Sequence, residues 1–312
     1  MTFDRRRFLE VIGLGGGLSW AGCSGPPEDP PAVPAASLFA KPLAFQMYTL
    51  RYMLAEGVGD IFERVASAGY TQIEAVQSTG ADGVVVTYDQ IADAVKAAGL
   101  TPVSSHVSAP VILGAGEIAA GPKTIEESAE WGAKHGFSWL VMPYVPNDQR
   151  GDDRDHYLRL AEKLNRAGEV FKSAGMDFAY HNHAFEFGPV GVSTPMDILL
   201  EATDPELVKI ELDVFWTSIA GLDASGWIRK HPGRAKLLHL KDKAADAPTQ
   251  FAEGVPAESF KEVGAGVIDF PAVLSAADAD GVALYVVEQD QTPGDAVDSL
   301  AMSAKYLRSV EV

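Results

Sequence analysis

Four ionisable side chains in the second half of the chain have the types and positions of a metal site. His181 and Asp213 end two short apolar runs, and His239 and Glu288 lie at the ends of two further runs. Two imidazoles and two carboxylates form a mixed nitrogen and oxygen donor set, which suits Mn²⁺, Zn²⁺, Co²⁺ or Fe²⁺. An unpaired carboxylate is costly to bury, so we expect a metal ion beside Asp213 and Glu288. A structural ion pair is the alternative for each of them.

Polar side chains beside these positions have types that can bind or convert a substrate. His183 follows His181 by two residues and Lys241 follows His239 by two, so each pair shares one face of a strand. His183 is therefore the alternative to His181 as a metal ligand. Lys241 either stabilises negative charge that develops during a reaction or pairs with Asp242 or Asp290. We expect Glu74 and His106 to contact either the substrate or the metal ligands from behind, with structural hydrogen bonding as the alternative. Tyr144 and Trp216 are expected to form an apolar wall against the substrate, with packing at the barrel rim as the alternative.

A repeated strand and helix pattern must position these residues. Past Leu43, amphipathic stretches end at a glycine that turns the chain directly into an apolar run. The eight apolar runs are Leu43–Tyr48, Gln72–Val76, Pro102–His106, Trp139–Met142, Phe178–His181, Val208–Asp213, Lys236–Leu240 and Leu284–Glu288. Strands that alternate with helices pair in parallel, and eight such units predict a closed (β/α)₈ TIM barrel of the α/β class over residues 43–312. In that barrel the catalytic groups come from the C-terminal ends of the strands.

A doubly wound open sheet is the competing fold. Its phosphate-binding glycines are absent after the first predicted strand, because Gln46–Arg51 contains no glycine. Gly264–Gly266 resembles part of a nucleotide loop, but it lies late in the chain and lacks a third glycine. We therefore interpret Gly264–Gly266 as a turn.

The first part of the chain is typical of a targeting segment. Arg5–Leu9 forms a basic start with a twin-arginine pattern, and the short apolar stretch Val11–Trp20 follows it. We predict a twin-arginine signal peptide over residues 1–22 and a proline-rich linker over residues 23–42. Cys23 ends a stretch that resembles a lipoprotein cleavage box, so a lipid anchor at Cys23 is an alternative to a freely soluble exported form. We expect a periplasmic or membrane-anchored protein that uses the twin-arginine export machinery.

The composition limits the classes of function open to the chain. Its 312 residues carry 25 Lys and Arg against 43 Asp and Glu, which gives a net charge of −18. This acidity argues against a nucleic-acid partner, because the phosphate backbone attracts basic surfaces. The single cysteine excludes an intrachain disulfide framework.

Taken together, these motifs resemble the xylose isomerase-like TIM-barrel superfamily, and within it the sugar phosphate isomerase/epimerase proteins. The resemblance extends over residues 43–308, and the YHNHAFEF run with a twin-arginine signal marks a subgroup. The matching segments are Gln46–Arg51, Ile73–Glu74, Ser105–His106, Tyr180–Phe187, Leu212–Trp216, His239–Asp242, Val263–Phe270 and Val287–Asp290.

The resemblance also implies a set of metal ligands. Three family ligands fall on Asp213, His239 and Glu288, while the fourth position, usually a glutamate, is His181 here. In the family's epimerases two metal-bound glutamates face each other across the substrate, and one removes the proton that the other returns. A histidine at position 181 is still a ligand, but its basicity and charge differ from those of a glutamate. This difference favours an elimination reaction over epimerisation.

The activity that the resemblance implies is that of an exported, divalent-metal-dependent sugar isomerase or epimerase. A base, either Glu288 or a group near His183 and Glu186, removes the proton beside a carbonyl, and the metal with Lys241 holds the enediolate. The first alternative is a keto-sugar lyase or dehydratase, in which a β-oxygen leaves. The second alternative is a non-catalytic sugar-binding barrel.

The nature of the substrate follows from the acidity and the export signal. We expect a neutral sugar, keto-glycoside or cyclitol, because a strongly acidic exported protein is poorly suited to anionic sugar phosphates. A nuclease of the endonuclease IV type shares the superfamily but needs a basic surface toward DNA, which a net charge of −18 does not provide.

Overall fold

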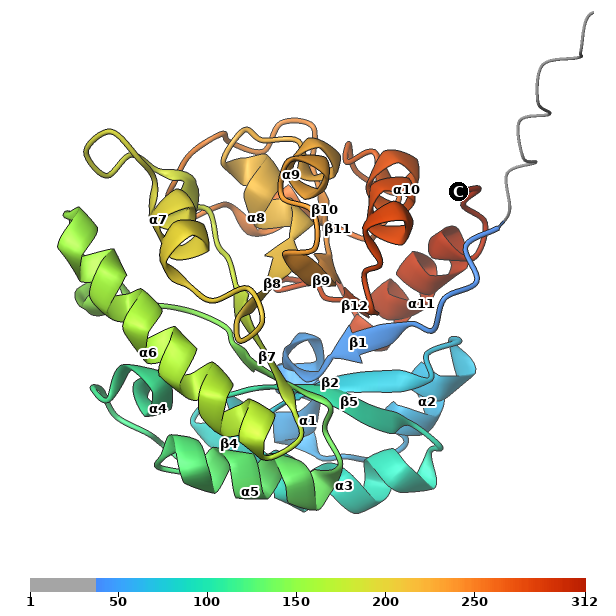
Figure 1. Cartoon of the computed structure of the whole chain (residues 1–312). Coiled ribbons are helices and arrows are strands. Elements are labelled where there is room, and N and C mark those ends of the chain that lie inside the picture. The colour runs from blue at the N-terminus through green and yellow to red at the C-terminus, as the bar shows by residue number, and fades with distance from the viewer. Residues whose placement is uncertain (1–37) are drawn as a thin grey trace, which may run out of the picture. The chain divides into compact units, whose positions relative to one another are not determined.

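The computed structural model describes residues 38–312, and in this part of the chain eight parallel strands close into a barrel (Figure 1). Following the barrel round, the strands are β1 (Ala44–Gln46), β2 (Gln72–Val76), β5 (Thr101–His106), β6 (Trp139–Met142), β7 (Asp177–His181), β8 (Lys209–Asp213), β9 (Ala235–Leu240) and β12 (Leu284–Val287). The predicted (β/α)₈ barrel is therefore confirmed. The predicted signal peptide, Cys23 and most of the predicted linker lie outside the described residues.

The observed strands agree with the predicted ones to within two residues at either end. The largest difference is at β1, which ends at Gln46 rather than at Tyr48. The Gln46 side chain accepts a hydrogen bond from the Tyr48 backbone N–H, and Met47–Leu50 forms a 3₁₀ turn. A polar side chain that caps the turn therefore ends the strand early.

Helices cover the outside of the barrel, as Figure 1 shows. They are α1 (Arg51–Glu56), α2 (Ile61–Ser67), α3 (Tyr88–Ala97), α4 (Ala109–Leu113), α5 (Ile125–His135), α6 (Arg154–Ser173), α7 (Pro195–Ala202), α8 (Val214–Ile219), α9 (Ala224–Lys230), α10 (Phe270–Asp280) and α11 (Ala296–Leu307). Two short antiparallel pairs complete the fold: β3 (Ser78–Ala81) with β4 (Val84–Thr87), and β10 (Asp242–Lys243) with β11 (Phe260–Lys261). Within residues 38–312, no helix is both long enough and apolar enough to cross a membrane.

Local sequence explains where the long helices begin and end. Asp153 accepts a hydrogen bond from the His156 backbone N–H at the start of α6, and Thr124 caps α5 in the same way. Gly136 ends α5 with a φ of 78°, a left-handed conformation that glycine adopts without steric cost. The chain can then turn at once into the next strand, which keeps the helix ends at one side of the barrel.

Side chains inside the barrel lie in layers because alternate residues of each strand point inward. A small apolar cluster fills the interior, and its buried members are Ala44, Val141, Ala179, Leu237, Leu284 and Val286. Two residues further along their strands, the inward positions become polar: Gln46 follows Ala44, His181 follows Ala179, and His239 follows Leu237. The apolar layer therefore carries a polar layer at the C-terminal end of the barrel.

Asp242 anchors the segment that contains Gly264–Gly266. Its carboxylate accepts hydrogen bonds from four backbone N–H groups, those of Lys243, Gly264, Gly266 and Ile268, at 2.7–3.1 Å. The segment is a turn, as predicted, and Asp242 is committed to holding it rather than to pairing with Lys241.

We predict that Asp242→Ala lowers the free energy of unfolding by about 2–4 kcal/mol, because backbone donors that a buried carboxylate now satisfies lose their acceptor. Urea unfolding followed by circular dichroism measures the change. Asp246→Ala is the matched control, since Asp246 is exposed. Equal stabilities of the two variants would contradict this role of Asp242.

Candidate active site

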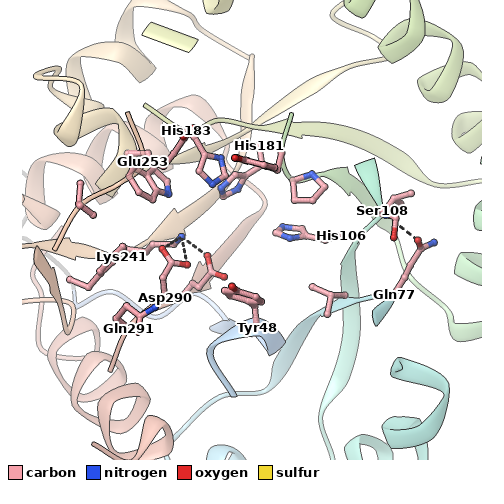
Figure 2. Close-up of a pocket in the computed structure, with 18 of the residues that line it drawn as sticks. Tyr48, Gln77, His106, Ser108, His181, His183, Lys241, Glu253, Asp290 and Gln291 are labelled. Atoms are coloured by element: carbon pink, nitrogen blue, oxygen red, sulfur yellow. Dashed lines mark hydrogen bonds and ion pairs between the residues drawn. The ribbon is translucent and has the colours of Figure 1, made fainter. Parts of the chain in front are cut away.

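A cavity of about 600 Å³ opens at the C-terminal ends of the strands. Most of the residues predicted to act on substrate or metal line it: His106, Tyr144, His181, His183, Trp216, Lys241 and Glu288. Figure 2 shows His106, His181 and His183 along one side of the cavity and Lys241 with Asp290 along another. The other predicted residues, Glu74, Glu186, Asp213 and His239, are buried around this cavity and do not line it.

The structure brings the four predicted metal ligands together. Ligand atoms of Asp213, His239 and Glu288 all lie within 4.8 Å of one another. His239 Nδ1 lies 2.9 Å from Glu288 Oε2, and His181 Nε2 lies 3.5 Å from Asp213 Oδ2. Residues from β7, β8 and β9 and from the end of β12 thus converge, as neighbouring strands of a closed barrel allow.

The donor set fits a divalent cation. Two carboxylates and one imidazole nitrogen lie within 4.8 Å of one another, and His181 adjoins them through its contact with Asp213. Asp213 Oδ2 has no hydrogen-bond partner in the described part of the chain. The contact of Asp213 Oδ2 with Lys241 is an ion pair without hydrogen-bond geometry. Mixed nitrogen and oxygen ligands of this kind suit Zn²⁺, Mn²⁺, Co²⁺ or Fe²⁺.

Lys241 is the central cation of the cavity floor. Its Nζ lies 3.0 Å from Asp213 Oδ2, 2.5 Å from Glu288 Oε2 and 3.2 Å from Asp290 Oδ2. Although burial disfavours its charge, these three carboxylates hold the pKa of Lys241 well above its ordinary value. Of the two partners considered from the sequence, Lys241 therefore pairs with Asp290 and not with Asp242.

Asp290 and Glu288 differ in how strongly each holds its proton. Burial raises the pKa of Asp290 to about 6, against the attraction of Lys241. Burial also acts on Glu288, but Lys241 and His239 outweigh it and hold the pKa of Glu288 well below its ordinary value. Glu288 is therefore a weak base, whereas Asp290 holds a proton for part of the time near neutral pH.

A second polar layer lies beneath the predicted ligands, and its main member, Glu211, was not predicted from the sequence. Glu211 is fully buried on β8, and its Oε2 lies 2.9 Å from His181 Nδ1, 3.1 Å from His106 Nε2 and 3.2 Å from His239 Nε2. Its signal was present in the sequence: Glu211 precedes Asp213 by two, so both side chains point into the barrel. Glu211 is not the last residue of its strand, so a prediction from strand ends alone does not include it.

Glu74 belongs to the same layer. Its Oε1 accepts a hydrogen bond from Gln46 at 2.8 Å and lies 2.6 Å from His239 Nε2 and 3.1 Å from His106 Nε2. Burial opposes its charge, but His106 and His239 hold the pKa of Glu74 well below its ordinary value. Of the two positions expected for Glu74, the structure thus shows the one behind the predicted ligand His239 and not the one in the cavity.

The charges of the three histidines in this layer differ. At His106, the charges of Glu74 and Glu211 outweigh the effect of burial and raise the pKa of the imidazole to about 9. At His239, the charges of Glu211, Glu288 and Glu74 also outweigh burial, and they hold the pKa well above its ordinary value. Burial and the neighbouring His239 and His183 instead hold the pKa of His181 well below its ordinary value, so His181 is neutral.

His183 forms one wall of the cavity with Tyr144 and Trp216. Its ring centroid lies 4.9 Å from that of Tyr144 and 5.2 Å from that of Trp216. Burial, and after it the charge of Lys241, hold the pKa of His183 well below its ordinary value. Its Nδ1 has no hydrogen-bond partner within residues 38–312, so His183 is a neutral imidazole with capacity to accept a proton.

Glu186, predicted to take part in catalysis, faces away from the cavity. It accepts hydrogen bonds from the Tyr180 hydroxyl at 2.6 Å and from the His183 backbone N–H at 2.8 Å. The chain after β7 curls into the 3₁₀ turn Phe185–Phe187, which carries Glu186 back against the strand. Burial raises its pKa to about 8, although these donors act in the opposite direction.

We predict that Glu186→Gln stabilises the protein progressively as pH rises from about 4.5 to 8. The folded carboxyl holds its proton to higher pH than the unfolded one, so its favourable contribution is complete below the unfolded pKa and is lost as pH rises through the folded value. Glutamine mimics the protonated form and removes this loss, which is on the order of 4 kcal/mol.

Thermal unfolding of both proteins across that pH range tests the Glu186 prediction. The gap in melting temperature should widen toward pH 8. Glu262→Gln, a substitution at a buried glutamate outside the cavity, is the control for the change of residue type. A gap that stays constant across the range would rule out a raised pKa at Glu186.

Comparison with known proteins agrees with this architecture. The family model described as xylose isomerase-like TIM barrel matches residues 62–309. Among solved structures, a sugar phosphate isomerase/epimerase from Parabacteroides distasonis superposes with a TM-score of 0.69 at 26% identity, covering 89% of this chain and 96% of that one. An IolI protein with a bound zinc atom has the same fold, with a TM-score of 0.61 at 15% identity over 85% of this chain and 96% of that one.

Curated relatives are similar over a shorter stretch. The inosose dehydratase of Geobacillus thermodenitrificans is 35% identical over 144 residues, which is 43% of this chain and 47% of that protein. An inosose dehydratase of Clostridium perfringens is 29% identical over 167 residues, which is 50% of this chain and 55% of that protein. The chain thus spans about half the length of the curated relatives that it matches.

Proposed function

The chain belongs to the xylose isomerase-like TIM-barrel family, and we propose that it is a divalent-metal-dependent lyase that acts on a neutral carbohydrate or cyclitol carrying a carbonyl group. The reaction is elimination of a β-oxygen as water or as an alcohol. The similarity to inosose dehydratases supports this alternative over the isomerase or epimerase first expected from the sequence.

The observation that carries the proposal is the presence of two chemically different groups in one cavity, an imidazole at His183 and a carboxyl at Asp290. His183 Nδ1 has no hydrogen-bond partner within residues 38–312, whereas the Asp290 carboxyl lies 3.2 Å from Lys241 Nζ, and burial raises its pKa to about 6. Elimination needs one group that removes a proton and another that supplies one to the leaving oxygen. An epimerase needs two matched bases on opposite faces of the substrate, and here the predicted ligand at position 181 is a histidine.

We assign the following roles to the protein groups. His183 takes the proton from the carbon beside the carbonyl, and the electron pair of that C–H bond forms a C=C bond as the C–O bond at the β-carbon breaks. Asp290 gives its proton to the leaving oxygen, and Lys241 stabilises negative charge on the carbonyl oxygen. We assign the base to His183 rather than to Glu288, because the Glu288 carboxylate contacts Lys241 and His239, whereas His183 Nδ1 has no hydrogen-bond partner within residues 38–312. Tyr144 and Trp216 supply an apolar wall for the ring of the substrate.

His181, Asp213, His239 and Glu288 are the residues that would hold the metal. A divalent ion supplies Lewis acidity, which polarises a carbonyl and orients the hydroxyl beside it. The donor types leave Mn²⁺, Zn²⁺, Co²⁺ and Fe²⁺ as candidates.

The charges that line the cavity support an uncharged substrate. Among the residues described, Lys241 is the one Lys or Arg that lines the cavity, and three carboxylates already surround it. The other cationic side chain of the lining, His106, is likewise occupied, because its Nε2 lies 3.1 Å from both Glu74 Oε1 and Glu211 Oε2. A phosphate group needs free cationic donors, so this cavity disfavours a sugar phosphate.

We predict that the full-length protein with Mn²⁺ converts inosose or a keto-glycoside to an unsaturated ketone, and that a chelator abolishes the reaction. Mass spectrometry and NMR of incubations in D₂O detect the loss of water or alcohol. Lys241→Met lowers kcat by about 10²–10⁴-fold, because the cation that stabilises the developing charge is lost. Lys243→Met is the matched control, since Lys243 donates to the Ser218 carbonyl and does not line the cavity.

Other products of the same incubations would overturn the proposal. Deuterium at the carbon beside the carbonyl without any elimination would identify an isomerase or epimerase. Sugar binding without chemical change, in the presence of bound metal, would identify a non-catalytic barrel.

We also propose that the protein is exported with residues 1–22 as its twin-arginine signal, so that a periplasmic or lipid-anchored enzyme remains. Fractionation of the producing bacterium should place the shortened protein outside the inner membrane, and Arg5→Lys combined with Arg6→Lys should keep it in the cytosol. Shortened protein that partitions into detergent only while Cys23 is intact would identify the anchored form. Full-length protein confined to the cytosol of the unmodified strain would overturn export.

A further inference from the structure

We propose that Glu211 and Glu74 are positioning residues that orient His181 and His239 as metal ligands from the layer beneath them. The inference rests on the metal site proposed above and adds to it two carboxylates that bind no metal themselves. Both are fully buried, and neither lines the cavity. Any effect of Glu211 or Glu74 on a bound ion or substrate therefore passes through the histidines.

The contacts of His181 show how this works. Its Nδ1 lies 2.9 Å from Glu211 Oε2, while its Nε2 lies 3.5 Å from Asp213 Oδ2. An acceptor at Nδ1 favours the tautomer with its proton there, and the lone pair of Nε2 then faces the predicted ligands. Among the residues described, Glu211 is the one hydrogen-bond partner of the His181 ring, so it fixes the tautomer and the rotation of that ring.

The contacts of His239 repeat the arrangement with the two nitrogens exchanged. Its Nε2 lies 2.6 Å from Glu74 Oε1, and its Nδ1 lies 2.9 Å from Glu288 Oε2. A proton kept on Nε2 leaves Nδ1 free to bind a cation beside Glu288. Each of the two histidines thus has one nitrogen toward a buried carboxylate and the other toward a predicted ligand.

Other residues hold the two carboxylates in place. Gln46 donates a hydrogen bond to Glu74 at 2.8 Å, and His106 Nε2 lies 3.1 Å from both Glu74 Oε1 and Glu211 Oε2. His106 therefore bridges the pair. A carboxylate fixed in this way can fix the ring above it.

A second metal ion held by His106, His181, Glu211 and His239 is the competing interpretation, because their ligand atoms also lie within 4.8 Å of one another. The hydrogen bonds favour the positioning role: His181 Nδ1 and His106 Nε2 both bond Glu211 Oε2, at 2.9 and 3.1 Å, and His239 Nε2 bonds Glu74 Oε1 at 2.6 Å. The number of ions bound per chain separates the two interpretations.

Cobalt binding to the chelator-treated full-length protein tests the inference without measuring activity. The visible absorption of Co²⁺ reports the ligand geometry, and competition with a chromophoric chelator gives the affinity. We expect one ion per chain in the unmodified protein and in Glu211→Gln, with the affinity of the variant lowered about 10- to 100-fold and its spectrum changed. Glu74→Gln should act in the same direction through His239. Glu262→Gln, at a buried glutamate outside the site, should bind Co²⁺ unchanged.

A double-mutant cycle shows whether Glu211 acts through His181. Once His181→Ala has removed the ring, adding Glu211→Gln should lower the Co²⁺ affinity by much less than it does in the unmodified protein. Equal losses in both backgrounds, or a Glu211→Gln variant that folds and binds Co²⁺ as the unmodified protein does, would overturn the inference. A fall from two ions to one in Glu211→Gln would overturn it in favour of a second metal.

The outcome for the unmodified protein keeps this inference separate from the proposed function. Failure of the unmodified protein to bind any divalent ion would refute the metal site and the positioning role together. Binding of one ion with no elimination would refute only the proposed reaction. Circular dichroism of each variant confirms that it is folded.

Discussion

The burial of opposite charges at one end of the barrel is the constraint on which the rest of the site depends. Lys241, Asp213 and Glu288 are at most 5% exposed, and an isolated charge at such a depth would be prohibitively costly. Each charge is tolerated because its partners lie within about 3 Å. The positions of these groups are therefore set jointly, and a change at one of them alters the charge that its neighbours carry.

The barrel itself was predictable because it rests on local patterns. Apolar runs of strand length, amphipathic stretches and glycines such as Gly136 and Gly281 act over a few residues, and each is visible in the sequence. The end of β1 was predicted less well, since it depends on one side chain, Gln46, that caps the turn after it. The convergence of His181, Asp213, His239 and Glu288 followed from the barrel, because neighbouring strands end at the same face.

The layer beneath the ligands was harder to predict. The contacts of Glu211 with three histidines join β5, β7, β8 and β9, and they exist only once the barrel is closed. Glu186 was instead predicted to lie in the site, but the structure places it outside the cavity. Its position beside His183 in the sequence suggested a shared role, but the 3₁₀ turn Phe185–Phe187 reverses its direction and places it against Tyr180. Alternation along a strand predicts which face a residue occupies, and it no longer applies once the strand has ended.

The two layers together would let the same residues bind the proposed cation and also remain paired without it. An imidazole nitrogen binds a metal only when it carries no proton, so a metal at Nδ1 of His239 must displace the proton shared there with Glu288. The proton on Nε2 is held by Glu74 and need not move. Lys241 would compete with a metal ion for Asp213 and Glu288, because it contacts both carboxylates. Its third partner, Asp290, is not a predicted ligand. Asp290 can therefore keep Lys241 charged and within the cavity whether a proton or a metal neutralises the other carboxylates.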